Sequence, residues 1–221
     1  MYCNPSDLPK LKPVLQVMSQ PDGVETNPKD RPQSRSLVTL NQVFDAFPGS
    51  VFNIDLKQSS PQLVDQVASE IFKRGIQPNV IWGSDSSVEL TAYLYDKYQD
   101  IPLFFGTRGV IRAVILYWLG ILPFVTFQES YFQPPHSWCY VLRNHKSLKT
   151  TSWKEWFKYR VLTYLFMQAS LFAHLSARGI PVWMWIINDE DGFDDAFKTY
   201  SVDGVMTDYP SKLRKYIDTR M

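Results

Sequence analysis

Apolar and polar positions follow a regular order along the first half of the chain, with helix-like and strand-like spacings taking turns. Apolar residues at intervals of three and four predict helices, and short apolar runs predict strands. The expected elements are a helix over 37–47, a strand over 51–56, a helix over 61–75, a strand over 79–83, a helix over 86–98 and a strand over 101–106. This alternation favours a parallel sheet, so we expect an α/β fold.

The alternation stops at Thr107. Residues 110–127 are almost entirely apolar, but Arg112 interrupts them near one end and Pro123 near the other. An uninterrupted bilayer span needs ~20 apolar residues, which this stretch approaches. Three interpretations stay open: a helix that lies in or re-enters a membrane interface, a buried helix, and a true span.

The remaining elements are read from the same spacings. We expect loops over 1–36 and 130–151, a long helix over 152–178, a strand over 182–187, a helix over 190–200, a strand over 204–207 and a helix over 210–217. Together with the apolar stretch, the second loop forms a hydrophobic insertion, which we place at 107–151.

Composition narrows the class of protein. The 221 residues are 45% hydrophobic, enough for one globular domain with a core. The net charge is +1, so nucleic acid is not expected as a partner. Aromatic residues make up 15% of the chain, and amphipathic rings favour membrane interfaces. Cys3 and Cys139 lie far apart in the sequence, which predicts free thiols and no disulfide framework.

The strand near residue 54 carries the first candidate site. A period of two puts Asn53, Asp55 and Lys57 on one face and apolar residues on the other. In a barrel the polar face would point inward, where the Asp55 carboxylate could ligate a hard cation and Lys57 could hold a phosphate. The alternative is an edge strand that faces solvent with an Asp–Lys ion pair.

The strand over 182–187 carries the second candidate, Trp185, near its C-terminal end. Its ring is either a wall for a glycerol or acyl group or ordinary core packing. Asn188 is a plausible N-cap of the helix that follows. Thr207 and Asp208 precede Pro210 at another helix start, which suits a phosphate or a simple cap.

The three histidines, His136, His145 and His174, do not fall at the end of any expected strand. A general base needs a placed geometry, so none of them is expected to be catalytic.

Four segments in this order resemble one family. Residues 37–48 resemble the helix before its fourth strand, and Asn53-Ile54-Asp55-Leu56-Lys57 resembles its Asn-Ile-Glu-Ile-Lys strand, with Asp for Glu. Trp185-Ile186-Ile187-Asn188 resembles its Trp-Thr-Val-Asn, and residues 203–210 resemble its last strand and turn. As an ordered set they resemble the glycerophosphodiester phosphodiesterase family, and the apolar insertion resembles its membrane-associated lysophospholipase D branch.

The resemblance implies a TIM (β/α)8 barrel, of which residues 1–221 would be a partial domain lacking the first three strands. It implies a phosphodiester hydrolase of glycerophospholipid metabolism that acts on lysophospholipids or glycerophosphodiesters with a divalent cation, Mg²⁺ or Ca²⁺. It also implies a membrane surface as partner and an intracellular, membrane-associated location, on endoplasmic reticulum or cytoplasmic membranes.

In this resemblance Asp55 is a metal ligand, and Lys57 and Trp185 contact substrate. The family's His-Arg-Gly motif is missing from the sequence, so no catalytic residue is assigned. We therefore expect an inactive, truncated form; the alternative is a non-catalytic, membrane-associated remnant or regulatory isoform. About five parallel strands should form an incompletely closed sheet, with Asp55 and Trp185 close together at its C-terminal end.

Overall fold

The computed structural model describes residues 38–58, 60–85, 87–136 and 153–220. They belong to two compact units, one running from Gly49 to Met206 and the other made of the residues before and after it. Both cysteines, the expected loop over 1–36 and most of the expected loop over 130–151 lie outside the described residues.

The smaller unit contains two helices, α2 (Leu40–Ala46) and α10 (Pro210–Arg220). Thr39 starts α2 with a capping box: its backbone N–H donates to the Gln42 side chain at 2.8 Å, and the Gln42 N–H donates to the Thr39 hydroxyl at 3.3 Å. Proline is favoured in the first turn of a helix because it has no N–H to leave unpaired, and α10 begins at Pro210 as expected.

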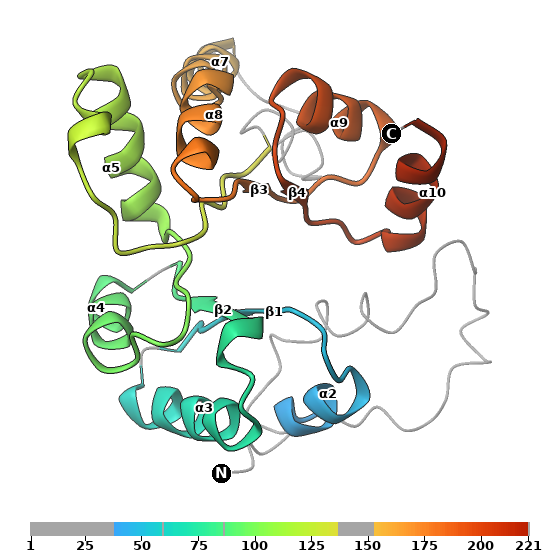
Figure 1. The fold of residues 1–221 in the computed structure, drawn as a ribbon. Helices are drawn as coiled ribbons and strands as arrows, with labels where there is room; N and C mark the ends of the chain where they lie inside the picture. The colour runs from blue at the N-terminus through green and yellow to red at the C-terminus, as the bar shows by residue number, and fades with distance from the viewer. Residues whose placement is uncertain (1–37, 59, 86, 137–152, 221) are drawn as a thin grey trace. The chain divides into compact units, whose positions relative to one another are not determined.

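The larger unit contains the remaining helices and strands (Figure 1). In chain order these are β1 (Phe52–Asp55), α3 (Pro61–Arg74), η2 (Gln77–Asn79), β2 (Val80–Gly83), α4 (Val88–Lys97), α5 (Thr107–Trp118), η3 (Leu122–Phe124), α7 (Trp153–Phe166), α8 (Ala169–Ala177), β3 (Trp183–Met184), α9 (Glu190–Asp194), the π-helical turn η5 (Asp195–Thr199) and β4 (Gly204–Val205). The alternation of strands and helices confirms the α/β class.

In the described part of the chain every strand pairing is parallel, and the pairings connect six segments in the order of the chain. β1 pairs with β2, and β3 pairs with β4. Isolated parallel bridges link the segments between these two pairs: Trp82–Leu103, Phe104–Tyr131 and Phe132–Val182. The sequence predicted five strands and assigned Tyr131 and Phe132 to a loop. Two paired residues are too few to show any alternation, so the sequence pattern gave no sign of this segment.

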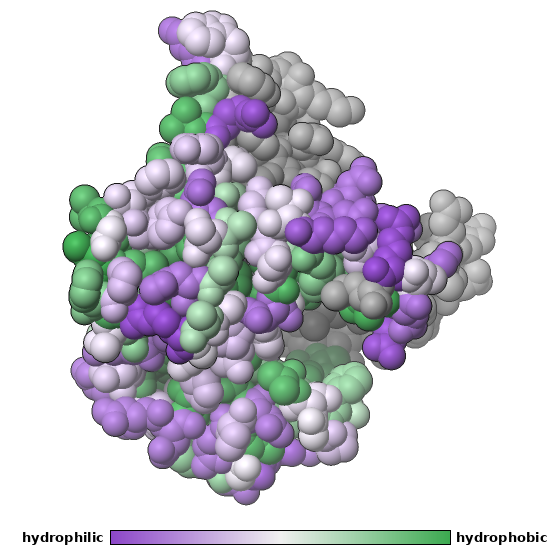
Figure 2. All heavy atoms as spheres, turned by 45° about the horizontal axis from the view of Figure 1, so that its top comes forward, coloured by the Kyte–Doolittle hydropathy of each residue, from purple (hydrophilic) through white to green (hydrophobic). Residues whose placement is uncertain are grey.

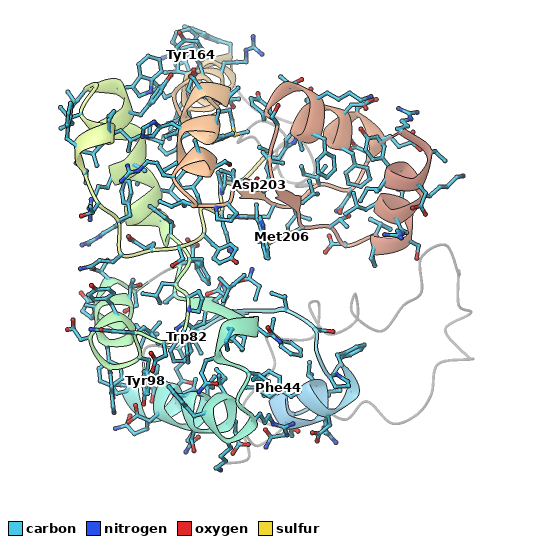
Figure 3. The ribbon with its side chains drawn as sticks, in the orientation of Figure 1. Phe44, Trp82, Tyr98, Tyr164, Asp203 and Met206 are labelled. Atoms are coloured by element: carbon cyan, nitrogen blue, oxygen red, sulfur yellow. The ribbon has the colours of Figure 1, made fainter. Side chains whose placement is uncertain are left out.

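The array is strongly curved. The Asn53 amide on β1 contacts Gln133, just beyond the fourth segment, at 3.3 Å, and the sulfur of Met206 (labelled in Figure 3), just beyond the sixth, at 3.7 Å. In a flat sheet with strands ~4.8 Å apart, these segments would be about 14 and 24 Å from β1. Among the described residues no backbone pairing joins β1 to β4, so the barrel is not closed.

The sequence placed one helix over 152–178, and that expectation is wrong. The structure has two helices, α7 and α8, separated at Met167 and Gln168. Gln168 has an extended backbone and its side-chain amide donates to the carbonyl of Tyr164, while Met167 is buried. No helix among the described residues is long and apolar enough to cross a membrane.

Helices α3 and α4 are joined by a polar cluster around Asp65. Its carboxylate accepts hydrogen bonds from Tyr98 at 2.7 Å, Lys97 at 2.9 Å and Tyr93 at 2.8 Å. These donors, with Tyr98 contributing most, lower the pKa of Asp65 from 3.8 to about 2.

We predict that Asp65→Asn lowers the thermal midpoint at neutral pH, because it removes the charge that the three donors stabilise. The folded-state pKa is below the unfolded one, so this stabilisation is present above pH 3.8 and is lost as the pH falls to about 2. Thermal melts across this range should show the wild type and the variant converging at the acidic end. Asp96→Asn, at an exposed position of the neighbouring helix α4, is the control and should shift the midpoint little at any pH.

Candidate functional site

Parallel strands place their C-terminal ends at one edge of the array, and Asp55 and Lys57 lie at this edge. The expected alternation is confirmed, since Asn53 and Asp55 are more exposed than Phe52 and Ile54. Asp55 and Lys57 form an ion pair between a carboxylate oxygen and Nζ. Their side chains are 33% and 72% exposed, so both can be reached from solvent.

Asn53, on the same face as Asp55, faces the interior of the curved array. Its amide and that of Gln133 bond reciprocally, each donating to the other's oxygen at 3.3 Å. Gln133 is buried, and its backbone carbonyl accepts from the indole N–H of Trp185 at 2.7 Å. Sequence reasoning missed Gln133 because it follows the unrecognised strand segment.

Trp185 is half-buried and held by this hydrogen bond, one residue after β3. The structure therefore connects the polar face of β1 to Trp185 through Gln133. A direct approach of Asp55 to Trp185 stays a prediction. Ile187, two residues further along, is fully buried, and its side chain lies against Gly192 of α9.

His136 also lies at the end of a parallel segment, which corrects the expectation that no histidine does. Its N–H donates to the Trp185 carbonyl at 2.7 Å, and the side chain is buried, with Nε2 3.7 Å from Asp195. Burial lowers the pKa of His136, while the charges of Asp195 and Asp189 oppose that shift. His145 lies outside the described residues, and His174 is on α8.

Polar side chains near the starts of α9 and α10 make local contacts. Asp189 caps α9 by accepting from the Gly192 N–H at 2.8 Å, so the cap is one residue later than the expected Asn188. In the smaller unit the Thr207 hydroxyl accepts from the Tyr209 N–H at 3.0 Å. The first contact supports a capping role for Asp189, whereas Thr207 closes a turn just before α10 begins at Pro210.

Backbone and hydroxyl contacts connect the residues that follow β1, β2 and the third segment. The Ser84 hydroxyl after β2 donates to the Leu56 carbonyl after β1 at 2.9 Å. Gly106 lies so close to the other side of Ser84 that an added Cβ would come within 2.7 Å of the Ser84 carbonyl oxygen. Only glycine fits at this position without moving the backbone.

A hollow of about 630 Å³ opens between α4 and the start of α5. Its charged lining is mixed, with Asp85, Glu89 and Glu129 against Arg108 and Arg112. The backbone N–H of Glu89 itself, the Ser87 hydroxyl and the charge of Arg108 lower the pKa of Glu89. The mixed charge gives this hollow no preference for one sign of ligand.

Comparison with known proteins gives the family. No family model matches the chain. Human lysophospholipase D GDPD1 is 34% identical over 218 residues, which cover 98% of this chain and 65% of the relative. Mouse lysophospholipase D GDPD3 is 28% identical over 216 residues, covering 96% and 62%. The chain belongs to the glycerophosphodiester phosphodiesterase family. It spans slightly less than two thirds of the length of these relatives.

Solved structures of this family are similar in part. A glycerophosphodiester phosphodiesterase from Thermotoga maritima has a TM-score of 0.49 and 16% identity, covering 83% of this chain and 64% of that one. A putative glycerophosphoryl diester phosphodiesterase from Silicibacter pomeroyi has a TM-score of 0.46 and 17% identity, covering 74% and 49%.

The divalent cation that the family resemblance implies needs several oxygen ligands. In the part of the chain that the structure describes, no group of three or more His, Cys, Asp or Glu could hold a metal ion. Asp55 stands at the expected position, but its partner is Lys57. These residues therefore do not make a metal site by themselves.

We predict that Asn53 and Gln133 are energetically coupled, because each amide satisfies the other. A double-mutant cycle of Asn53→Ala and Gln133→Ala, followed by urea denaturation, should give a coupling energy of about 0.5–1.5 kcal/mol. A matched cycle pairing Gln133→Ala with Gln58→Ala, at an exposed position on the same strand end, should be additive. Additivity in both cycles would show that the amide contact does not hold the array together.

Proposed function

We propose that this chain supplies the phosphate-binding side of a phosphodiester hydrolase of glycerophospholipid metabolism, of the lysophospholipase D type. The observation that carries the proposal is the placement of Asp55 and Lys57, exposed and side by side at the C-terminal end of β1. The 34% identity to a lysophospholipase D supports it. The proposed substrates are lysophospholipids or glycerophosphodiesters.

Lys57 is the residue suited to the substrate phosphate. Its ammonium is a compact charge on a flexible stem, and its present partner is Asp55. An exposed ion pair of this kind contributes only about 0–1 kcal/mol, so a phosphate can replace the Asp55 carboxylate at little cost. Asp55 would then be released to serve as one oxygen ligand of a Mg²⁺ or Ca²⁺ ion, whose other ligands the described residues do not supply.

Trp185 is the residue suited to the apolar part of the substrate. The hydrogen bond from its indole N–H to the Gln133 carbonyl fixes one edge of the ring. The ring is half-buried, so part of its apolar surface can still cover a glycerol or acyl group. Gln133 acts as a positioning residue in this proposal, since it touches Trp185 and Asn53.

We further propose that the curved array is part of a (β/α)8 barrel, as the family resemblance implies. Its six parallel segments in chain order and the inward Asn53–Gln133 contact support the proposal. An eight-stranded barrel would need two more strands than these, not the three that the sequence suggested.

The 221-residue chain is proposed to be inactive by itself. Its sequence carries no His-Arg-Gly motif, and His136, although at a strand end, is buried beside Asp195. The second candidate function is a non-catalytic, membrane-associated remnant or regulatory isoform, which the exposed apolar residues of α5 favour.

We predict no measurable release of choline or ethanolamine from lysophospholipids by the purified chain with Mg²⁺ or Ca²⁺. Loss of a positioned acid or base costs about 10²–10⁴-fold in rate. In a longer form of the protein that carries a His-Arg-Gly segment, activity should appear, Asp55→Ala should abolish it and Lys57→Ala should lower it. Headgroup release measured by an enzyme-coupled assay reports all three.

Asp96→Ala is the control for the longer form and should leave turnover unchanged, since Asp96 is exposed on α4. Turnover by the 221-residue chain that disappears in Asp55→Ala would contradict the proposed inactivity. Full activity of Asp55→Ala in the longer form would contradict the proposed site.

A further inference from the structure

The hollow of about 630 Å³ between α4 and the start of α5 is separate from the proposed hydrolytic site. Its lining comes from these two neighbouring helices (Figure 1) and from the residues that follow β2 and the third segment. Asp55, Lys57 and Trp185 do not belong to this lining. A cavity of this volume suits a small molecule.

The charged side chains of the hollow do not neutralise one another. Three carboxylates and two guanidiniums line it: Asp85, Glu89, Glu129, Arg108 and Arg112. In Figure 2 hydrophilic side chains gather beside the hydrophobic ones of α5. Within the described part of the chain, none of the three carboxylates forms an ion pair with either guanidinium. Both signs of charge are therefore available to a ligand.

Uncharged groups hold two of the carboxylates in place. The Thr107 hydroxyl donates to Asp85 at 2.6 Å, and the Ser87 hydroxyl donates to Glu89 at 3.2 Å. A carboxylate has two oxygens, so each can still accept from a ligand. Side chains that are already held lose less conformational entropy when a ligand binds.

Glu129 is the carboxylate best suited to a cation. The residue is half-buried and, among the described residues, its side chain has no hydrogen bond or ion pair. It lies against Gly109 in the first turn of α5, where an added Cβ would come within 2.9 Å of Oε1. Glycine at this position therefore makes room for the Glu129 carboxylate. Partial removal of a charge from water costs free energy, which a bound cation would offset.

The two arginines present positive charge from one helix. Arg108 and Arg112 are one turn apart on α5, so their side chains are neighbours. The Arg112 guanidinium donates to the Thr126 carbonyl at 3.3 Å and lies 5.2 Å from the centroid of the Phe127 ring. Guanidinium groups match a phosphate or a carboxylate through paired N–H donors. An oxyanion is therefore the expected partner of these arginines.

The cation is expected to be organic. In the residues that the structure describes, no group of three or more His, Cys, Asp or Glu could hold a metal ion. An ammonium group needs no such set, because each of its N–H bonds can go to a separate acceptor. A primary ammonium fits Glu129 better than a quaternary one, which has no N–H to donate.

We propose that this hollow binds a small zwitterion, with its primary ammonium at Glu129 and its oxyanion at Arg108 and Arg112. Two kinds of compound share this chemistry: phosphate esters of amino alcohols, and amino acids. The proposal goes beyond the hydrolytic site and does not depend on it, since Asp55, Lys57 and Trp185 are not part of the hollow.

Isothermal titration calorimetry of the purified chain at low ionic strength is the test. Phosphoethanolamine or β-alanine should bind with a dissociation constant of about 1 mM or lower. Ethanolamine and inorganic phosphate each carry one of the two charges and should bind about tenfold more weakly, as should phosphocholine, whose ammonium has no N–H. Tighter binding of phosphoethanolamine would identify the oxyanion as a phosphate, and tighter binding of β-alanine would identify it as a carboxylate.

Two variants test the ammonium position. Glu129→Gln and Gly109→Ala should each weaken binding of the zwitterion about tenfold and leave binding of inorganic phosphate unchanged. In Gly109→Ala the added Cβ displaces the Glu129 carboxylate, whereas alanine favours the helix, so the thermal midpoint should not fall. Asp96→Asn, exposed on α4 and outside the hollow, is the control and should bind like wild type.

The oxyanion position has its own comparison. Arg108→Gln should weaken binding of the zwitterion and of inorganic phosphate alike, by about tenfold. Arg214→Gln on α10, whose ion-pair partner is Asp218, is the control and should bind like wild type. Lys57→Ala should also leave binding of the zwitterion unchanged, because Lys57 does not line the hollow.

No binding of either zwitterion at about 10 mM would overturn the proposal. Equal binding by Glu129→Gln and Asp96→Asn would overturn it as well. Loss of binding in Lys57→Ala would contradict the assignment to this hollow, because it would place the ligand in the proposed hydrolytic site.

Discussion

The contact between the Asn53 and Gln133 amides is the interaction on which the arrangement of the site depends. Parallel pairing alone would place the C-terminal ends of the strands along one edge, far apart from one another. The reciprocal amide bonds reach from the first segment to the fourth, and Asn53 reaches the sixth at Met206. Because the array is curved, the C-terminal ends of distant strands lie near one another. Trp185 belongs to the same group of residues, since its indole N–H donates to the Gln133 carbonyl.

The features that the sequence predicted are those set by local chemistry. A period of two identified the face that carries Asp55 and Lys57, and the spacing of apolar residues predicted a helix over 61–75. In the structure this helix is α3, which Ser60 caps, Pro61 begins and Gly75 ends in the left-handed conformation with φ of 66°. These signals lie within a few residues of the element that they define. The structure contains these elements as predicted because the contacts that define each one come from residues close to it in the sequence.

The features that the sequence did not predict depend on distant residues. Tyr131 and Phe132 became part of the array through one bridge on either side, and Gln133 is explained only by Asn53, 80 residues away. The break between α7 and α8, where Met167 is buried, likewise could not be predicted from the spacing of apolar residues. His136 was misjudged for the same reason, since its position depends on the unrecognised segment.

The contacts around Ser84 also bear on how such a protein can change over evolutionary time. The Ser84 hydroxyl holds the Leu56 carbonyl, and Gly106 fits against the Ser84 carbonyl on the other side. The first residues of the loops that follow three successive strands, Leu56, Ser84 and Gly106, are therefore held at a fixed spacing by backbone contacts. Insertions or deletions further along those loops would leave these three residues in place. Homologues are thus free to vary the loops above the site, while substitutions at Gly106 should be rare among them.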